Sequence, residues 1–164
     1  MYTPYKILAI DSNHDCLNNG LRDAGFIVDE DYVSSKESIE DRIANYDGLI
    51  VRSRFPIDKT FLSKATKLKF IGRVGAGLEN IDEDFAADRN IVLFNSPEGN
   101  RDSVGEHAVG MLLMLMHHLR RADNEVRNGI WKREENRGDE LKGKTVGIIG
   151  YGNMGNAFAK RLQG

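Results

Sequence analysis

The stretch Gly150-Tyr151-Gly152-Asn153-Met154-Gly155 reads G-x-G-x-x-G and decides how the last third of this chain is expected to fold. It follows the apolar segment Lys144–Ile149, which predicts a buried parallel strand, and precedes Asn156–Leu162, which predicts a helix. In such a unit the glycines allow a tight turn, close approach of a pyrophosphate, and close packing of helix on strand. N–H groups at the helix N-terminus then face the anion. The stretch therefore predicts a dinucleotide-binding βα unit, against the alternative of a glycine-rich turn without a ligand.

A site of this type also has an acidic residue about 20 positions after the glycines, which holds the ribose hydroxyls. The sequence stops at Gly164, before that position. We therefore expect residues 99–164 to be an incomplete Rossmann domain, without the group that selects NAD over NADP.

Short apolar runs alternate with amphipathic stretches over residues 1–98. Near-continuous apolar strands separated by helices are typical of a parallel sheet covered on both faces. Five strands in this length predict a complete flavodoxin-like α/β domain. The expected strands are Lys6–Ile10, Phe26–Val28, Gly48–Val51, Leu68–Val74 and Ile91–Phe94, and the expected helices are Asp15–Ala24, Lys36–Asn45, Lys59–Ala65 and Glu83–Asp88.

A long helix is expected to join the two domains. The turn-rich segment Asn95–Asn100 precedes the S-x-x-E spacing of Ser103 and Glu106, a capping box that predicts a helix from Ser103 to Val126. Its middle is apolar on nearly every side, which is typical of a helix buried between two bodies. We expect it to pack on the second domain and to support a homodimer. Trp131 is either packed locally or an interface anchor.

Composition excludes several classes of protein. The 164 residues are 40% hydrophobic and 29% charged with a net charge of −2, which gives no general attraction to nucleic acid or anionic membranes. Cys16 is the only cysteine, so a disulfide framework is excluded and a reducing, cytoplasmic environment is expected. No apolar run reaches the roughly 20 residues of a membrane span, and no metal-ligand spacing is present.

Several motifs resemble the D-isomer-specific 2-hydroxyacid dehydrogenase family, and within it the members that act on 3-phosphoglycerate. They occur in the family's order and spacing over about the last two-thirds of the chain. The matching stretches are Val51–Ser53, Leu68–Asp82, Asn95–Asn100, Ser103–His107 and Glu140–Gly150.

The resemblance implies a substrate domain whose sheet is completed by a C-terminal return around an inserted NAD domain. It also implies that a catalytic His, its carboxylate partner and a substrate-binding Arg follow the glycine motif. No catalytic residue is therefore expected in this chain. We assign no catalysis to its histidines, His14, His107, His117 and His118.

Arginines at two predicted strand ends indicate anion binding. Arg52-Ser53 and Arg73 come where doubly wound sheets bind ligands, and guanidinium groups bind oxyanions bidentately. The alternative is two ordinary surface arginines. The resemblance assigns substrate contacts to Arg52, Ser53, Arg73, Gly75 and Asn100. Arg54 is expected to point the other way and to be solvated.

The resemblance assigns cofactor contacts to Ala76, Gly150, Gly152, Asn153, Met154 and Gly155. Three of these residues depart from the family pattern. Ala76 replaces a threonine, which removes one hydroxyl contact, and Asn153-Met154 stands where Arg-Ile or His-Ile is common. Backbone contacts to the pyrophosphate do not depend on these side chains, so NAD remains the expected cofactor.

Taken together, these features predict the N-terminal part of an NAD-dependent oxidoreductase that acts on the CH–OH group of a D-2-hydroxyacid, with 3-phosphoglycerate as the expected substrate. The fragment alone is expected to be inactive. Two alternatives remain open: a non-catalytic interaction module gated by NAD, and a reductase of glyoxylate or hydroxypyruvate.

Overall fold

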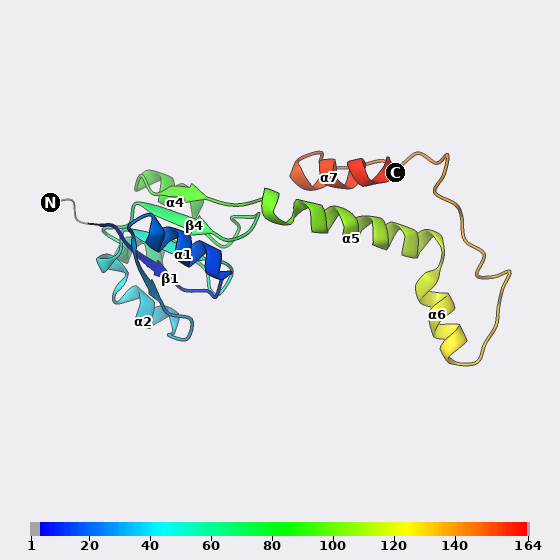
Figure 1. Cartoon of the computed structure of the whole chain (residues 1–164), viewed down its shortest axis with the longest axis horizontal. Helices are drawn as coiled ribbons and strands as arrows, with labels where there is room; N and C mark the ends of the chain where they lie inside the picture. Colours follow the sequence, from blue (N-terminus) through cyan, green and yellow to red (C-terminus); the bar gives the residue numbers. More distant parts are fainter. Residues whose placement is uncertain (1–3, 164) are drawn as a thin grey trace. The chain divides into compact units, whose positions relative to one another are not determined.

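The computed structural model describes residues 4–163 of the chain. The chain forms two compact units, Met1–Pro97 and Glu98–Gly164 (Figure 1). Each unit is described by itself.

The first unit is built on a five-stranded sheet whose strands all run parallel. Its order, β2-β1-β3-β4-β5, is that of a flavodoxin-like domain and confirms the predicted fold class. Each strand begins and ends within two residues of the predicted boundaries, and β3 matches its prediction at both ends. They are β1 (Lys6–Ala9), β2 (Ile27–Glu30), β3 (Gly48–Val51), β4 (Phe70–Arg73) and β5 (Val92–Phe94).

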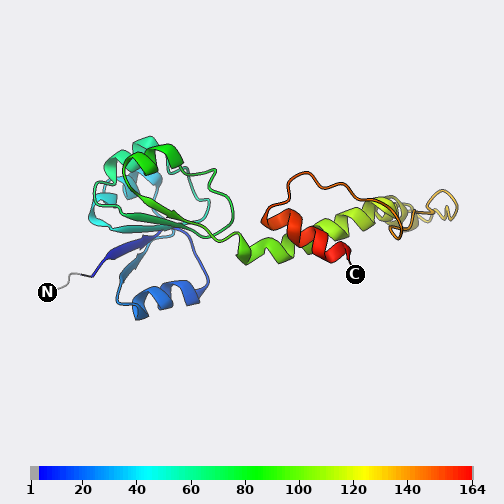
Figure 2. The same ribbon diagram turned by 90° about the horizontal axis from the view of Figure 1, so that it is seen from above.

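Helices cover both faces of this sheet (Figure 2). On one face α1 (Asp15–Asp23) packs over a small cluster that contains Ile7, Ala9 and Ile50. The larger core lies on the other face, around Leu49 and Ile71. The elements that cover it are α2 (Lys36–Glu40), the 3₁₀ turn η1 (Ile43–Asn45), α3 (Lys59–Lys64) and α4 (Glu83–Asp88). The single helix predicted over Lys36–Asn45 is therefore two short elements.

Side chains that accept hydrogen bonds from free N–H groups fix where these helices begin. Asp58 accepts from the Phe61 N–H at the start of α3, and Asp82 accepts from the Phe85 N–H at the start of α4. Such N-caps satisfy backbone donors that have no partner inside the helix.

Asp47 ties together the amino ends of three neighbouring strands. Its carboxylate accepts from the Lys6 N–H at 2.9 Å, and its backbone carbonyl accepts from the Lys69 N–H at 2.8 Å. The ammonium groups of Lys67 and Lys69 lie 3.2 and 3.7 Å from the carboxylate, which is almost fully buried. Burial acts to raise the pKa of Asp47, but the Lys6 N–H and the two lysines outweigh it, and the pKa is lowered overall.

The second unit contains three helices within the described residues: α5 (Glu98–Met116), α6 (Leu119–Arg127) and α7 (Asn153–Leu162). The predicted start at Ser103 is wrong, because α5 begins at Glu98. Pro97 directly precedes it, and proline's fixed φ suits the entry to a helix. The acidic Glu98 then lies at the positive end of the helix dipole.

The single helix predicted to run to Val126 is also wrong, since the chain breaks after Met116. His118 adopts a left-handed conformation with φ 53°. The Met116 carbonyl accepts a hydrogen bond from the Asp139 N–H at 3.0 Å. Asp139 lies in the loop between α6 and α7, so this loop supplies a partner for a carbonyl at the end of α5.

The predicted strand Lys144–Ile149 does not form. Within the described part of the second unit no strand lies beside it, and an extended segment without a neighbour lacks ladder hydrogen bonds. Ile149 is consequently fully exposed. The turn after it survives, because Gly150 has φ +88° and α7 follows.

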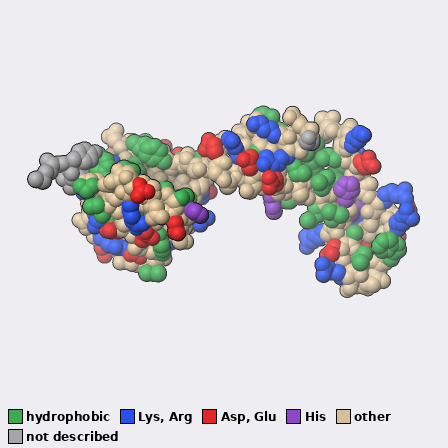
Figure 3. Space-filling view, in the orientation of Figure 1, with side chains coloured by type: hydrophobic (Ala, Val, Ile, Leu, Met, Phe, Trp, Pro, Cys, Tyr) green, Lys and Arg blue, Asp and Glu red, His purple; other side chains and the backbone are tan. Residues whose placement is uncertain are grey.

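The prediction that the apolar helix is buried is wrong for most of α5. Met111 is 60% and Leu115 is 73% exposed, and Figure 3 shows hydrophobic side chains gathered over the second half of this helix. The first half packs against α7, where a Cβ at Gly105 would lie 3.0 Å from the Ala157 backbone. Arg161 adds ion pairs to Asp102 and Glu106 at 3.3 Å each.

Substitution of Asp47 tests its role in linking the strands. Because its pKa is lowered in the folded state, the ionised carboxylate stabilises the fold above its unfolded pKa of about 3.9, and this contribution disappears as pH falls through the folded pKa. We expect Asp47→Asn to lower the free energy of unfolding at pH 7 by about 1–3 kcal/mol and to flatten its decline below about pH 4. Urea denaturation at several pH values measures both effects. Equal loss at pH 3 and pH 7 would contradict the role given to the charge.

Candidate functional site

Two arginines lie at the carboxyl edge of the sheet because of the register between β3 and β4. Val51 and Arg73 are direct partners in that register, so Arg52 leaves one strand beside the last residue of the next. Arg52, Ser53 and Arg73 therefore share one edge of the first unit. Ligands of doubly wound sheets bind at this edge.

The backbone of Arg52 is held on both sides by polar side chains. Its N–H donates to Asp11 Oδ2 at 2.6 Å, and its carbonyl accepts from Asn80 Nδ2 at 3.2 Å. The side chains of Arg52 and Ser53 are exposed. Within residues 4–163 the Arg52 guanidinium has no ion-pair partner, so its donors are available to an anion.

The Arg73 side chain folds back over Gly75. A Cβ at Gly75 would lie only 1.4 Å from Arg73 Nη1, and φ at this glycine is +154°, so a side chain here would displace the guanidinium. Arg73 Nε is buried and has no hydrogen-bond acceptor in the part of the chain that the structure describes. A buried donor without an acceptor is costly, and a carboxylate or phosphate oxygen would satisfy it.

The loop after β4 holds Ala76 beside this arginine. Its carbonyl accepts from Asn95 Nδ2 at 2.6 Å, and the Gly75 carbonyl accepts from the Ser96 N–H at 2.8 Å. The segment after β5 therefore fixes the glycine loop.

The prediction that Arg54 is solvated is wrong. Arg54 is half-buried, and its Nη1 donates to the carbonyls of Ile10 and Asp31 at 2.9 and 2.8 Å. Its Nη2 donates to the Ser34 carbonyl. The alternation rule applies only to extended strands, and the chain bends after Val51.

The glycine motif in the second unit forms the turn that a pyrophosphate would need. A Cβ at Gly155 would lie 2.1 Å from the Gly150 carbonyl oxygen, so helix and turn meet there with no room for a side chain. Gly152 is the N-cap of α7, has open space beside it, and offers no capping side chain. Asn153 and Met154 begin the helix, and their N–H groups lie at its positive end.

A hollow of about 410 Å³ adjoins this turn. It contains two cationic side chains, Arg101 and Lys160, that the sequence reasoning missed because neither belongs to a motif. The remaining lining residues are Asp102, Tyr151, Gly152, Asn153, Asn156 and Ala157.

Asn100, the fifth predicted substrate residue, lies in the first turn of α5 and therefore in the second unit. It is exposed. The structure thus groups Arg52, Ser53, Arg73, Gly75 and Ala76 in one unit, and Asn100 with the glycine motif in the other.

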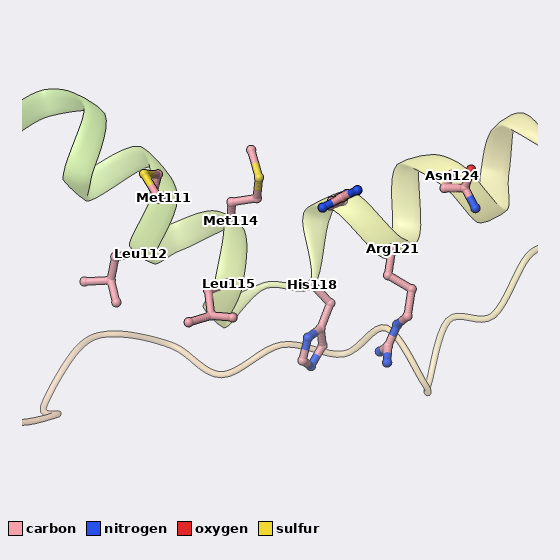
Figure 4. Close-up of a pocket in the computed structure, with 8 residues that line it drawn as sticks. Met111, Leu112, Met114, Leu115, His118, Arg121 and Asn124 are labelled. Carbon is pink, nitrogen blue, oxygen red and sulfur yellow. The ribbon is translucent and has the colours of Figure 1, made fainter.

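A second hollow in this unit, of about 840 Å³, is lined by none of the predicted site residues. It is mainly apolar and extends along α5 and α6. Figure 4 shows Leu112 and Leu115 on the same side as His118 and Arg121. No group of three or more potential metal ligands occurs among residues 4–163, and no helix in that range is long and apolar enough to cross a membrane.

Comparison with known proteins places this geometry in a family. The family model for the D-isomer specific 2-hydroxyacid dehydrogenase catalytic domain matches residues 7–160. The D-3-phosphoglycerate dehydrogenase of Rattus norvegicus is 37% identical over 158 residues, which cover 96% of this chain and 30% of the relative. The chain thus spans about a third of the length of this relative.

Solved structures agree with the fold. The PH0520 protein from Pyrococcus horikoshii has a TM-score of 0.85 and 29% identity, with 98% of this chain and 50% of that chain covered. The NAD-dependent formate dehydrogenase from Staphylococcus aureus, solved in complex with NAD, has a TM-score of 0.76 and 26% identity, with 96% and 53% covered. The family model covers nearly the whole chain, and the sequence relatives agree with it: this chain belongs to the D-isomer-specific 2-hydroxyacid dehydrogenases.

Proposed function

We propose that this chain is the N-terminal part of an NAD-dependent oxidoreductase that oxidises the CH–OH group of 3-phosphoglycerate. The observation that supports the substrate class is the pair Arg52 and Arg73 at adjacent strand ends. Among residues 4–163, the exposed Arg52 has no ion-pair partner and the buried Nε of Arg73 has no acceptor. A substrate with a carboxylate and a phosphate offers each arginine an oxyanion. The relatives named for D-3-phosphoglycerate support this choice over glyoxylate or hydroxypyruvate.

In this proposal the first unit binds and orients the acid. Arg52 and Arg73 bind its anionic groups, Ser53 donates a hydroxyl hydrogen bond, and the Gly75 loop brings backbone groups close to the ligand. The assignment of Asn100 to the substrate rests on the family resemblance alone. NAD, when bound, accepts the hydride from the carbon that carries the hydroxyl.

The cofactor is assigned to the glycine turn. Gly150, Gly152 and Gly155 give the pyrophosphate access to the backbone of Asn153 and Met154. The assignment of Ala76 to the cofactor rests on the family resemblance alone. The fit is supported by the open space beside Gly152 and by the absence of a capping side chain on α7. The general acid/base is assigned to the parent polypeptide beyond residue 164, so the chain alone is expected to have no turnover. We place the protein in the cytoplasm, in the synthesis of serine.

A non-catalytic module gated by NAD is the second candidate, because the glycine turn is present whereas no catalytic histidine is assigned. A downstream Arg, Glu and His in family order would favour the enzyme. Their absence from the parent sequence would favour the module.

Titration with 3-phosphoglycerate, followed by ¹H–¹⁵N NMR, tests the substrate assignment. We expect amide shifts at Arg52, Ser53 and Gly75. Arg52→Met and Arg73→Met should each weaken binding about 10- to 100-fold, because charge-assisted hydrogen bonds contribute about 1.5–3 kcal/mol. Arg89→Met is the matched control, since it removes the same charge at the end of α4. Unchanged affinity in both site variants would contradict the assignment. Stronger shifts with glyoxylate or hydroxypyruvate would favour the alternative substrates.

Gly152→Ala tests the cofactor assignment. Alanine fits the fold, because nothing lies within 4 Å of the added Cβ, but the methyl group occupies the space through which a pyrophosphate would approach. We expect NAD binding, measured by calorimetry, to weaken about tenfold or more, a loss of about 1.4 kcal/mol. Gly147→Ala is the control, since its Cβ also meets nothing and lies outside the turn. Equal NAD affinity in wild type and Gly152→Ala would refute the site.

The exposed apolar surface of α5 also supports a homodimer, which burial of this surface would stabilise. Trp131 is 79% exposed and could serve as an anchor on the same unit. We expect Leu115→Glu to convert a dimer to a monomer in light scattering. Val33→Glu, at a 91% exposed position of the first unit, should leave the mass unchanged. A monomeric wild-type chain at high concentration would contradict the dimer.

A further inference from the structure

Arg54 connects three loops at the carboxyl edge of the sheet. Its guanidinium donates to Ile10 at the end of β1, and to Asp31 and Ser34 in the segment after β2. Arg54 itself follows β3, two residues after Arg52. One side chain therefore fixes the segment that carries Arg52 and Ser53 against both neighbouring loops.

The acceptors of Arg54 are themselves held in place. Ile10 donates its N–H to the Ile50 carbonyl at 3.0 Å, and Asp31 donates its N–H to the Ala9 carbonyl at 2.9 Å. The Asp31 carboxylate accepts from the Ser34 N–H at 2.9 Å and from Arg42. The carbonyls that Arg54 reaches thus belong to backbone that is hydrogen-bonded to the sheet. Asp31 is also held by Arg42, which lies between α2 and η1.

The contrast between Arg52 and Arg54 defines their roles. The Arg52 side chain is exposed and forms no ion pair with the residues that the structure describes. The Arg54 side chain instead donates to backbone carbonyls, so these donors are not available to a ligand. A planar fork of donors can reach several carbonyls at once, which the compact lysine ammonium does less well.

We propose that Arg54 is a positioning residue for the anion site. It acts by holding the Arg52-Ser53 backbone in the conformation that binds the substrate acid, and it does not touch the substrate. This inference rests on the proposed function, in that it assigns Arg54 to the same site. Without the hydrogen bonds of Arg54, the Arg52-Ser53 segment would be less ordered before the substrate binds, and the entropy lost on ordering it would oppose binding.

The test compares Arg54→Met and Arg54→Lys in the 164-residue chain by NMR. We expect both variants to increase the ps–ns motion of the Arg52 and Ser53 amides, seen as lower order parameters. Both should weaken 3-phosphoglycerate binding by about tenfold. Arg54→Lys keeps the charge, so full affinity in that variant would show that only charge matters and would overturn the proposal.

Arg22→Met is the matched control for stability. Arg22 also donates to a backbone carbonyl, that of Val28, and to Glu30, but it contacts neither Arg52 nor its neighbours. We expect it to lower the melting temperature without altering the order parameters of Arg52 and Ser53 or the affinity for 3-phosphoglycerate. If Arg54→Met lowered only the melting temperature, the role would be structural alone and the proposal would fail.

The two measurements, 3-phosphoglycerate affinity and amide order parameters, distinguish a failure of this inference from a failure of the proposed function. If the wild-type chain binds no 3-phosphoglycerate, the proposed substrate fails, while the order parameters of Arg52 and Ser53 still decide whether Arg54 fixes the segment. If Arg54→Met does not fold, Arg54→Lys supplies the same comparison. Order parameters that stay at wild-type values in Arg54→Lys would overturn the inference.

Discussion

The parallel register between β3 and β4 is the constraint on which the candidate substrate site depends. Because Val51 and Arg73 are paired, the strands end together, and the segments that follow them emerge side by side. The Val74 N–H then donates to the Val51 carbonyl at 2.8 Å, which continues the pairing past the last strand residue. The backbone hydrogen bonds of this register bring two arginines that are far apart in sequence to one edge of the sheet.

The sequence predicted the first unit well, since its elements are specified by local signals. Apolar runs gave all five strands, and capping residues such as Asp58 and Asp82 mark helix starts in the structure. The errors are at the ends of elements, where tertiary contacts decide. The helix predicted to end at Asn45 is interrupted after Glu40 in the structure, and no single residue of the sequence predicts this break.

In the second unit the same reasoning succeeded for the turn and failed for the strand. Gly150 and Gly155 specify their turn locally, by backbone freedom and by close contact. A strand instead needs a neighbouring strand. The apolar pattern of Lys144–Ile149 therefore predicts a strand only where such a neighbour is present. The capping box at Ser103 did not mark the helix start for a related reason. Pro97 favours an earlier start, and α5 begins at Glu98.

Arg54 shows how a binding site can depend on residues that a motif search treats as solvated. Alternation along a strand predicted an outward side chain, but the chain bends after Val51, and the guanidinium turns back to backbone carbonyls. Those carbonyls carry partial negative charge, so the Arg54 guanidinium has acceptors although no carboxylate among residues 4–163 pairs with it. Backbone carbonyls thus hold Arg54, and we expect the segment that carries Arg52 to be fixed before an anion binds.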